Sequence, residues 1–127
     1  MTENEIAAQI VDAAFKVHTH LGPGLLETVY ETAMEHELKK RGLKLIRQWG
    51  IPLVYDGERL KDGFRADLLV EGKVIVEFKS LEVVPKVAYK ILLTYLRLGD
   101  KRLGLLINFG SEYIKDGIRR VANELPE

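Results

Sequence analysis

Two acids and a lysine recur at strand-like spacing in the stretch FRADLLVEGKVIVEFKS, residues 64–80. Asp67, Glu77 and Lys79 have odd numbers, whereas Phe64, Ala66, Leu68, Val70, Val74, Val76 and Phe78 have even numbers. Side chains alternate between the two faces of a strand, so a three-residue loop at 71–73 places Asp67 opposite Glu77. A two-residue loop would set Asp67 against Val76 and put charge and apolar groups on both faces. We therefore expect the three-residue loop.

This pairing of acids has a chemical consequence. Two carboxylates opposed on neighbouring strands repel each other unless a cation lies between them, and Mg²⁺ is held by one or two carboxylates plus water and phosphate oxygens. Lys79 projects from the same face as Glu77 and could stabilise a developing negative charge. The alternative is a solvated hairpin face of paired charges, because Glu-x-Lys is common in a chain that is 30% charged.

Two helices are expected before this hairpin. Thr2 followed by Glu5 forms a capping box, and apolar residues recur at helical spacing to about His20. Gly22-Pro23-Gly24 ends that helix, and a second amphipathic run ends at the basic turn before Gly42. His18 lies at the end of the first helix, where we expect it to support the glycine-proline turn by hydrogen bonding.

The rest of the chain predicts a mixed sheet. Residues 43–78 have a strand-like pattern with turns at 56–57 and 71–72, which indicates a three-stranded meander. A helix from Pro85 to Gly99 precedes a buried strand at 103–109, so this strand should run parallel to the third. Ser111 is expected to cap a last helix with the apolar stripe Ile114, Ile118, Val121, Ala122 and Leu125. The predicted class is α/β with a mixed sheet flanked by helices.

Composition limits the possible classes of protein. The 127 residues are 46% apolar, carry 19 basic and 19 acidic side chains and include no Cys. These values predict one domain, residues 1–127, with no membrane span and a cytoplasmic location. Charge is locally uneven, since Lys86, Lys90 and Arg97 share one face of the predicted helix. This face is either a nucleic-acid contact or an ordinary solvated surface.

Three segments together resemble a known family. They are His18-Thr-His-Leu-Gly-Pro-Gly-Leu-Leu-Glu27-Thr-Val-Tyr30, the hairpin with Asp67 and Glu77-x-Lys79, and Gly-Leu-Leu-Ile-Asn-Phe-Gly at 104–110. They resemble the GxxExxY family of bacterial and archaeal proteins, which is similar to a compact branch of the PD-(D/E)XK nuclease superfamily. The resemblance implies a restriction-endonuclease-like α-β-β-β-α-β core, to which the helices predicted above add one at each end.

The resemblance also implies functional residues. Glu27 would be the helix-borne acid, Asp67 and Glu77 the carboxylates that bind Mg²⁺ or Mn²⁺, and Lys79 the catalytic lysine. Tyr30, His18 and Tyr95 would be supporting residues, and DNA or RNA would be the substrate. Such small nucleases often pair, so a homodimer is expected.

One region departs from the family pattern. The helix after the lysine usually carries His and Gln ahead of its Tyr, whereas this sequence has Ala88 and Ile91 before Tyr95. Apolar side chains cannot hydrogen-bond a phosphate or a water, and Ile91 could instead belong to the core. Two functions therefore stay open: a metal-dependent nuclease, or a catalytically inert module on the same scaffold that binds nucleic acid or protein.

Overall fold

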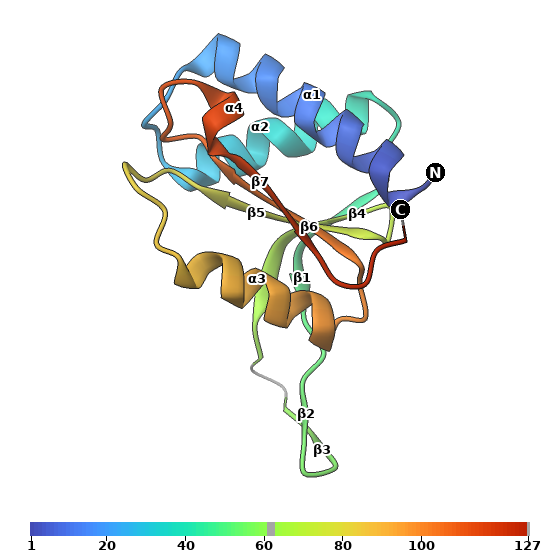
Figure 1. The fold of residues 1–127 in the computed structure, drawn as a ribbon. Coiled ribbons are helices and arrows are strands. Elements are labelled where there is room, and N and C mark those ends of the chain that lie inside the picture. Colours follow the sequence, from blue (N-terminus) through green and yellow to red (C-terminus); the bar gives the residue numbers. More distant parts are fainter. Residues whose placement is uncertain (61–62, 127) are drawn as a thin grey trace.

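A five-stranded mixed sheet, covered by helices on both faces, forms the body of the protein (Figure 1). The structure is a computed structural model that describes residues 1–60 and 63–126. The elements are α1 (Glu3–Leu21), α2 (Glu27–Lys40), β1 (Leu45–Gly50), β2 (Val54–Tyr55), β3 (Glu58–Arg59), β4 (Arg65–Val70), β5 (Val74–Lys79), α3 (Val87–Leu98), β6 (Leu103–Asn108), α4 (Ile114–Gly117) and β7 (Ile118–Ala122). Within the described ranges, no helix is long and apolar enough to cross a membrane.

The helices divide the core into two layers. On one face α1 and α2 pack through residues such as Ile10, Met34 and Leu38 against the sheet residues Leu68 and Val76. On the other face α3 packs alone, through the buried residues Ala88, Leu92 and Leu96. The predicted capping box at the start of α1 is confirmed, since Thr2 and Glu5 exchange side-chain to main-chain hydrogen bonds.

The sheet confirms the predicted register of the acid-bearing hairpin. Its order is β1-β4-β5-β6-β7. In the antiparallel β4–β5 pair Val70 faces Val74 and Leu68 faces Val76, so the connecting loop has the three residues 71–73. The β5–β6 pair is parallel, as predicted for strands joined through a helix.

The predicted meander is interrupted by a small inserted hairpin. Strands β1, β4 and β5 are the three antiparallel neighbours of the predicted meander. The segment of chain that joins β1 to β4 contains β2 and β3, which form a separate two-stranded sheet. This hairpin turns at Asp56 and Gly57, both with positive φ, as a two-residue primed turn requires. It projects from the end of the molecule below α3 in Figure 1.

The predicted C-terminal helix is wrong over most of its length. Helix α4 covers only Ile114–Gly117, Ser111 does not cap it, and residues Ile118–Ala122 form β7, antiparallel to β6. Ile118 packs on the α1–α2 side of the sheet and Val121 on the α3 side, which is the period of two of a strand. Strand β7 supplies hydrogen-bond partners to the main-chain groups along the edge of β6. The spacing of apolar residues within 114–125 cannot indicate such pairing with another segment.

Candidate metal and phosphate site

The two hairpin acids interlock at the point where the β4–β5 ladder opens. The main-chain N–H of Asp67 donates to Oε1 of Glu77 at 3.0 Å, and the main-chain N–H of Phe78 donates to Oδ2 of Asp67 at 2.8 Å. Each carboxylate thus takes the place of a main-chain acceptor on the neighbouring strand. The predicted juxtaposition of Asp67 and Glu77 is present in the structure.

Burial makes these carboxylates hard to ionise. Desolvation, followed by the charge of Asp67, raises the pKa of Glu77 to about 8, although the charge of Lys79 opposes this. Desolvation also raises the pKa of Asp67 to about 6, with further contributions from the charges of Glu31 and Glu27. Several carboxyl groups therefore converge here, and a bound cation would favour their ionised forms.

Helix α2 contributes two acids, of which the sequence analysis identified one. Glu27 is its first residue and is exposed, and it lies close enough to influence Asp67. Glu31, one turn later, is buried and forms an ion pair with Arg47 on β1. Glu31 follows Glu27 by four residues, so both lie on the same face of the helix. This spacing is the sequence feature from which Glu31 could have been predicted.

A second residue that sequence reasoning missed is Gln48 on β1. Its Nε2 donates to Oε1 of Glu31 at 3.0 Å and to Oδ1 of Asp67 at 3.3 Å, so it joins the helix to the strand. Gln48 has φ of 54°, an unusual conformation for a residue inside a strand. A polar residue in a strand gives no sequence signal for this role.

The loop that leads into α2 is fixed by Tyr30 and Ser80. The hydroxyl of the fully buried Tyr30 donates to the carbonyl of Gly22 at 2.6 Å and accepts the N–H of Leu25 at 3.0 Å. Ser80, directly after β5, donates to the carbonyl of Leu25. These bonds hold the start of α2, and therefore Glu27, beside the end of the strand that carries Lys79.

Asn108 fixes the chain that follows Lys79. Its Oδ1 accepts the N–H of Leu81 at 2.9 Å and its Nδ2 donates to the carbonyl of Leu81 at 2.9 Å. Gly110 lies so close that an added Cβ would stand 2.3 Å from the Leu81 carbonyl oxygen. The segment 104–110, noted only as part of a sequence pattern, thus anchors the exit of β5.

His18 has a different partner from the one expected. Its Nε2 lies 2.9 Å from the carbonyl oxygen of Ser111, and its ring stacks on Phe109. The imidazole therefore supports the loop after β6 and not the glycine-proline turn. That turn uses the main-chain carbonyl of His18, which accepts the N–H of Gly22 at 2.8 Å.

Helix α3 faces the end of β5 with Tyr95 and apolar side chains. Desolvation, with the charges of Glu77 and Asp67, raises the pKa of the Tyr95 hydroxyl, so this side chain lies near the acids. Ala88 and Ile91 line a cavity together with Glu77 and Lys79. The possibility that Ile91 belongs to the core is wrong, because 44% of the residue is exposed.

The basic stripe of α3 lies on its solvent side. Lys86, Lys90 and Arg97 are all exposed, whereas the buried residues of the helix are Ala88, Leu92 and Leu96. The three basic side chains therefore do not pack in the core, and they do not line the cavity beside Glu77.

The donor set fits a hard divalent cation with few protein ligands. Within residues 1–60 and 63–126, no group of three His, Cys, Asp or Glu side chains lies close enough to form a metal cluster. Mg²⁺ and Mn²⁺ accept one or two carboxylates and complete their shell with water and phosphate oxygens. The interlocked Asp67 and Glu77, whose oxygens retain further lone pairs, meet that requirement.

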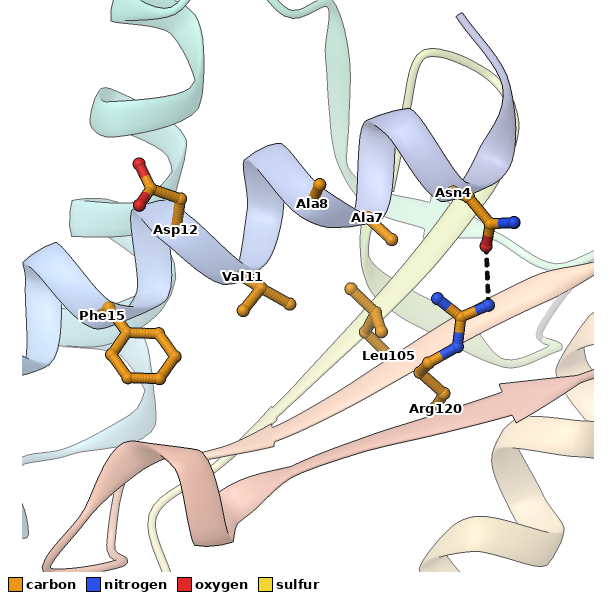
Figure 2. Close-up of a pocket in the computed structure, with 8 residues that line it drawn as sticks. All are labelled: Asn4, Ala7, Ala8, Val11, Asp12, Phe15, Leu105 and Arg120. Atoms are coloured by element: carbon orange, nitrogen blue, oxygen red, sulfur yellow. Dashed lines mark hydrogen bonds between the residues drawn. The ribbon is translucent and has the colours of Figure 1, made fainter.

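A larger groove lies along α1 and shares no lining residue with this site. Figure 2 shows its apolar floor, with Val11 and Leu105, and the hydrogen bond from Arg120 to Asn4 at 2.7 Å at one end. Its volume is about 450 Å³. No pair of opposed carboxylates lines it, and we assign it no role.

The fold and the site together define a class of protein. A mixed sheet with helices on both faces carries two opposed acids and a lysine at one end, with a further acid at the start of α2. A family model described as the PD-(D/E)XK nuclease superfamily matches residues 4–121. The chain belongs to this superfamily. Searches of curated proteins and of solved structures gave no match.

Proposed function

We propose that residues 1–127 form one metal-dependent nuclease domain that hydrolyses phosphodiester bonds in DNA or RNA. The observation that carries the proposal is the interlocked pair Asp67 and Glu77, with Lys79 two residues along the same strand. Membership of the PD-(D/E)XK superfamily supports nuclease-like chemistry. The GxxExxY pattern formed by Gly24, Glu27 and Tyr30 is consistent with the same assignment.

Each residue has a distinct proposed role. Asp67 and Glu77 would hold Mg²⁺ or Mn²⁺, with Glu27 as a further carboxylate, and the bound metal would supply Lewis-acid chemistry at a phosphoryl oxygen. The ammonium of Lys79 would donate hydrogen bonds to the phosphate and stabilise the charge that develops on it. In the hydrolysis, the oxygen of water bonds to phosphorus and gives up one proton, the bond from phosphorus to one ester oxygen breaks, and that oxygen takes up a proton.

The second candidate function is an inert module that binds nucleic acid or protein. It is favoured by Ala88 and Ile91, which present apolar groups to the side of Glu77 and Lys79 where polar groups could position a phosphate. The retained acids and lysine argue against it. A homodimer and a cytoplasmic location stay predictions from the sequence.

Metal titration followed by a cleavage assay separates the two functions. Calorimetry with Mg²⁺ and Mn²⁺ should show binding to the wild type, and labelled single-stranded and double-stranded DNA and RNA should be cleaved only when metal is present. Lys79→Met should keep metal binding and lose cleavage. Metal binding without cleavage of any of the four substrates would favour the inert module, and no metal binding would reject the proposed site.

A further inference from the structure

A small cavity adjoins the proposed phosphate site, and the hydrolysis described above uses only two of its lining residues, Glu77 and Lys79. It lies between β5 and α3 and has a volume of about 210 Å³. Glu77 and Lys79 supply its polar groups, and apolar side chains of α3 and the segment before it supply most of the remaining lining. Three of these residues are partly exposed, namely Val87 at 54%, Ile91 at 44% and Leu81 at 38%.

The chemistry of these walls limits what can fill the cavity. Exposed apolar side chains around a concave site with a few polar groups are typical of ligand pockets. A sugar-phosphate backbone is polar and would leave the apolar walls without a partner. The occupant must therefore have a flat or apolar body joined closely to an anion that Lys79 can bind.

We propose that this cavity receives one unstacked nucleobase, beside the phosphate held at Lys79. The inference rests on the proposed nuclease function and names its substrate class: strands with an unpaired nucleotide, such as single strands, flaps and bulges. The volume is below the roughly 300 Å³ at which pockets for drug-sized ligands begin, which suits one base and not a longer segment.

The ring of Tyr95 supplies an aromatic surface in the same cavity. Tyr95 lines it, and the ring lies 5.6 Å from that of Phe64, which limits its movement. Aromatic side chains stack on bases without regard to sequence, because every base has a π face. A base in a paired duplex would have to leave its stack to enter, whereas a base in a single strand pays little of that cost.

The test uses an oligonucleotide with one 2-aminopurine, whose fluorescence rises when the base leaves its stack. The same strand is presented alone, as a bulge and in a fully paired duplex, with Ca²⁺ as the cation and gel analysis to verify that the probe stays intact. The wild type should bind the single strand and the bulge about 10-fold more tightly than the duplex. Emission of the bulged base should change on binding, because the base exchanges its neighbours in the strand for the ring of Tyr95.

Two cavity variants and one matched control complete the experiment. Ala88→Met should fill the cavity and abolish both the preference and the fluorescence change, while Thr94→Met, which adds bulk to the exposed side of the same helix, should keep both. If Ala88→Met is poorly folded, Tyr95→Leu, which removes the aromatic surface of the cavity, replaces it. Equal affinity for duplex and single strand, or an unchanged preference in both cavity variants, would overturn the proposal.

The outcome is distinguishable from failure of the proposed function. The protein could prefer unpaired bases, lose that preference in Ala88→Met, and cleave none of the substrates. This result would reject hydrolysis and retain the base site. Metal-dependent cleavage at equal rates on duplex and single strand, unaffected by Ala88→Met, would retain hydrolysis and reject the base site.

Discussion

Asp67 and Glu77 each provide the hydrogen-bond acceptor that the other strand's main chain lacks. The Asp67 N–H donates to Glu77 at 3.0 Å, and Asp67 in turn accepts the N–H of Phe78 at 2.8 Å. The two carboxylates are therefore part of the hairpin ladder as well as a source of repulsion. An amide side chain keeps an acceptor oxygen, so Asn and Gln can preserve these bonds while removing the charge.

We first predict opposite effects of these amides with and without metal. Without metal and above about pH 8, where both carboxylates are ionised, Asp67→Asn and Glu77→Gln should be stabilising, because each removes like-charge repulsion and a desolvated charge. Near pH 7, where Glu77 keeps its proton, Glu77→Gln should be close to neutral. With Mg²⁺ or Mn²⁺, the wild type should be stabilised according to the ratio of metal concentration to dissociation constant, and both variants should lose this gain. Thermal melting in EDTA and in metal tests both parts. A large loss of stability in metal-free Glu77→Gln would identify a structural charge pair instead.

The raised pKa of Glu77 predicts how metal-free stability depends on pH. Between pH 4.5 and about 8 the folded protein retains a proton on Glu77 that the unfolded chain has lost. Stability should therefore fall as pH rises through this window, by at most about 1.4 kcal/mol per pH unit for one proton. The pKa of Asp67 is about 6, so the part of the fall between pH 6 and 8 belongs mainly to Glu77.

Urea unfolding in EDTA at pH 6, 7 and 8 measures this dependence. Glu77→Gln should flatten the curve relative to the wild type, and the contribution of the His residues cancels in the comparison because both proteins contain them. Parallel curves for the two proteins would show that Glu77 ionises normally in the folded state.

Gln48 should influence metal binding without being a metal ligand. Its amide donates to both Asp67 and Glu31, so Gln48→Ala should leave the Asp67 carboxylate less well oriented. Loss of such a supporting bond commonly weakens metal affinity by about 10- to 100-fold. Calorimetry with Mn²⁺ measures the affinity. The control is Thr32→Ala, which removes a hydrogen bond from Arg47 to the Thr32 hydroxyl and leaves both bonds of Gln48 in place. Unchanged affinity in Gln48→Ala would limit Gln48 to a structural role.

The Tyr30 hydroxyl should stabilise the loop that positions Glu27. Tyr30→Phe removes both hydrogen bonds, which should cost about 0.5 to 1.5 kcal/mol, because the Tyr30 side chain is buried while Gly22 and Leu25 are partly open to water. Urea unfolding measures the change. Tyr113→Phe, at a residue that is 61% exposed, should have almost no effect. Equal stability of the two variants would mean that water replaces the lost hydroxyl.

The basic stripe of α3 predicts a salt-dependent contact. Replacing Lys86, Lys90 and Arg97 together by Gln should weaken DNA binding uniformly across sequences and reduce the log-log salt slope by up to about three contacts. Stability should hardly change because all three residues are exposed. The control replaces Lys40 and Lys44, two exposed residues at the opposite end of α2 from Glu27. An unchanged slope in the triple variant would place the binding surface elsewhere.

The hairpin that carries the acids was predictable because its constraint is local. Alternation of apolar residues decides the register, and the structure pairs Val70 with Val74 as this requires. The three long helices were predictable for the same reason, since each has its own apolar stripe. The segment after Ser111 was not, because Ile118 and Val121 fit a helical stripe as well as a strand, and only the unpaired edge of β6 selects the strand.

The rest of the candidate site depends on contacts between distant segments. Gln48 meets Asp67 and Glu31 only after β1 pairs with β4, and Asn108 meets Leu81 only after β6 pairs with β5. No pattern within a single segment identifies such partners. Position 91 shows the same limit, since its apolar side chain suggested burial although it lies at the exposed mouth of a cavity.

The bonds between Asn108 and Leu81 also bear on the order in which the protein is synthesised. Asn108 follows Leu81 by 27 residues, and β6, the second neighbour of β5, is translated only after α3. A growing chain therefore carries β5 as an open edge, where the charges of Glu77 and Lys79 discourage pairing with other chains. Translation therefore produces Asp67, Glu77 and Lys79, the residues of the proposed site, before the Asn108 bonds that fix the chain after Lys79 can form.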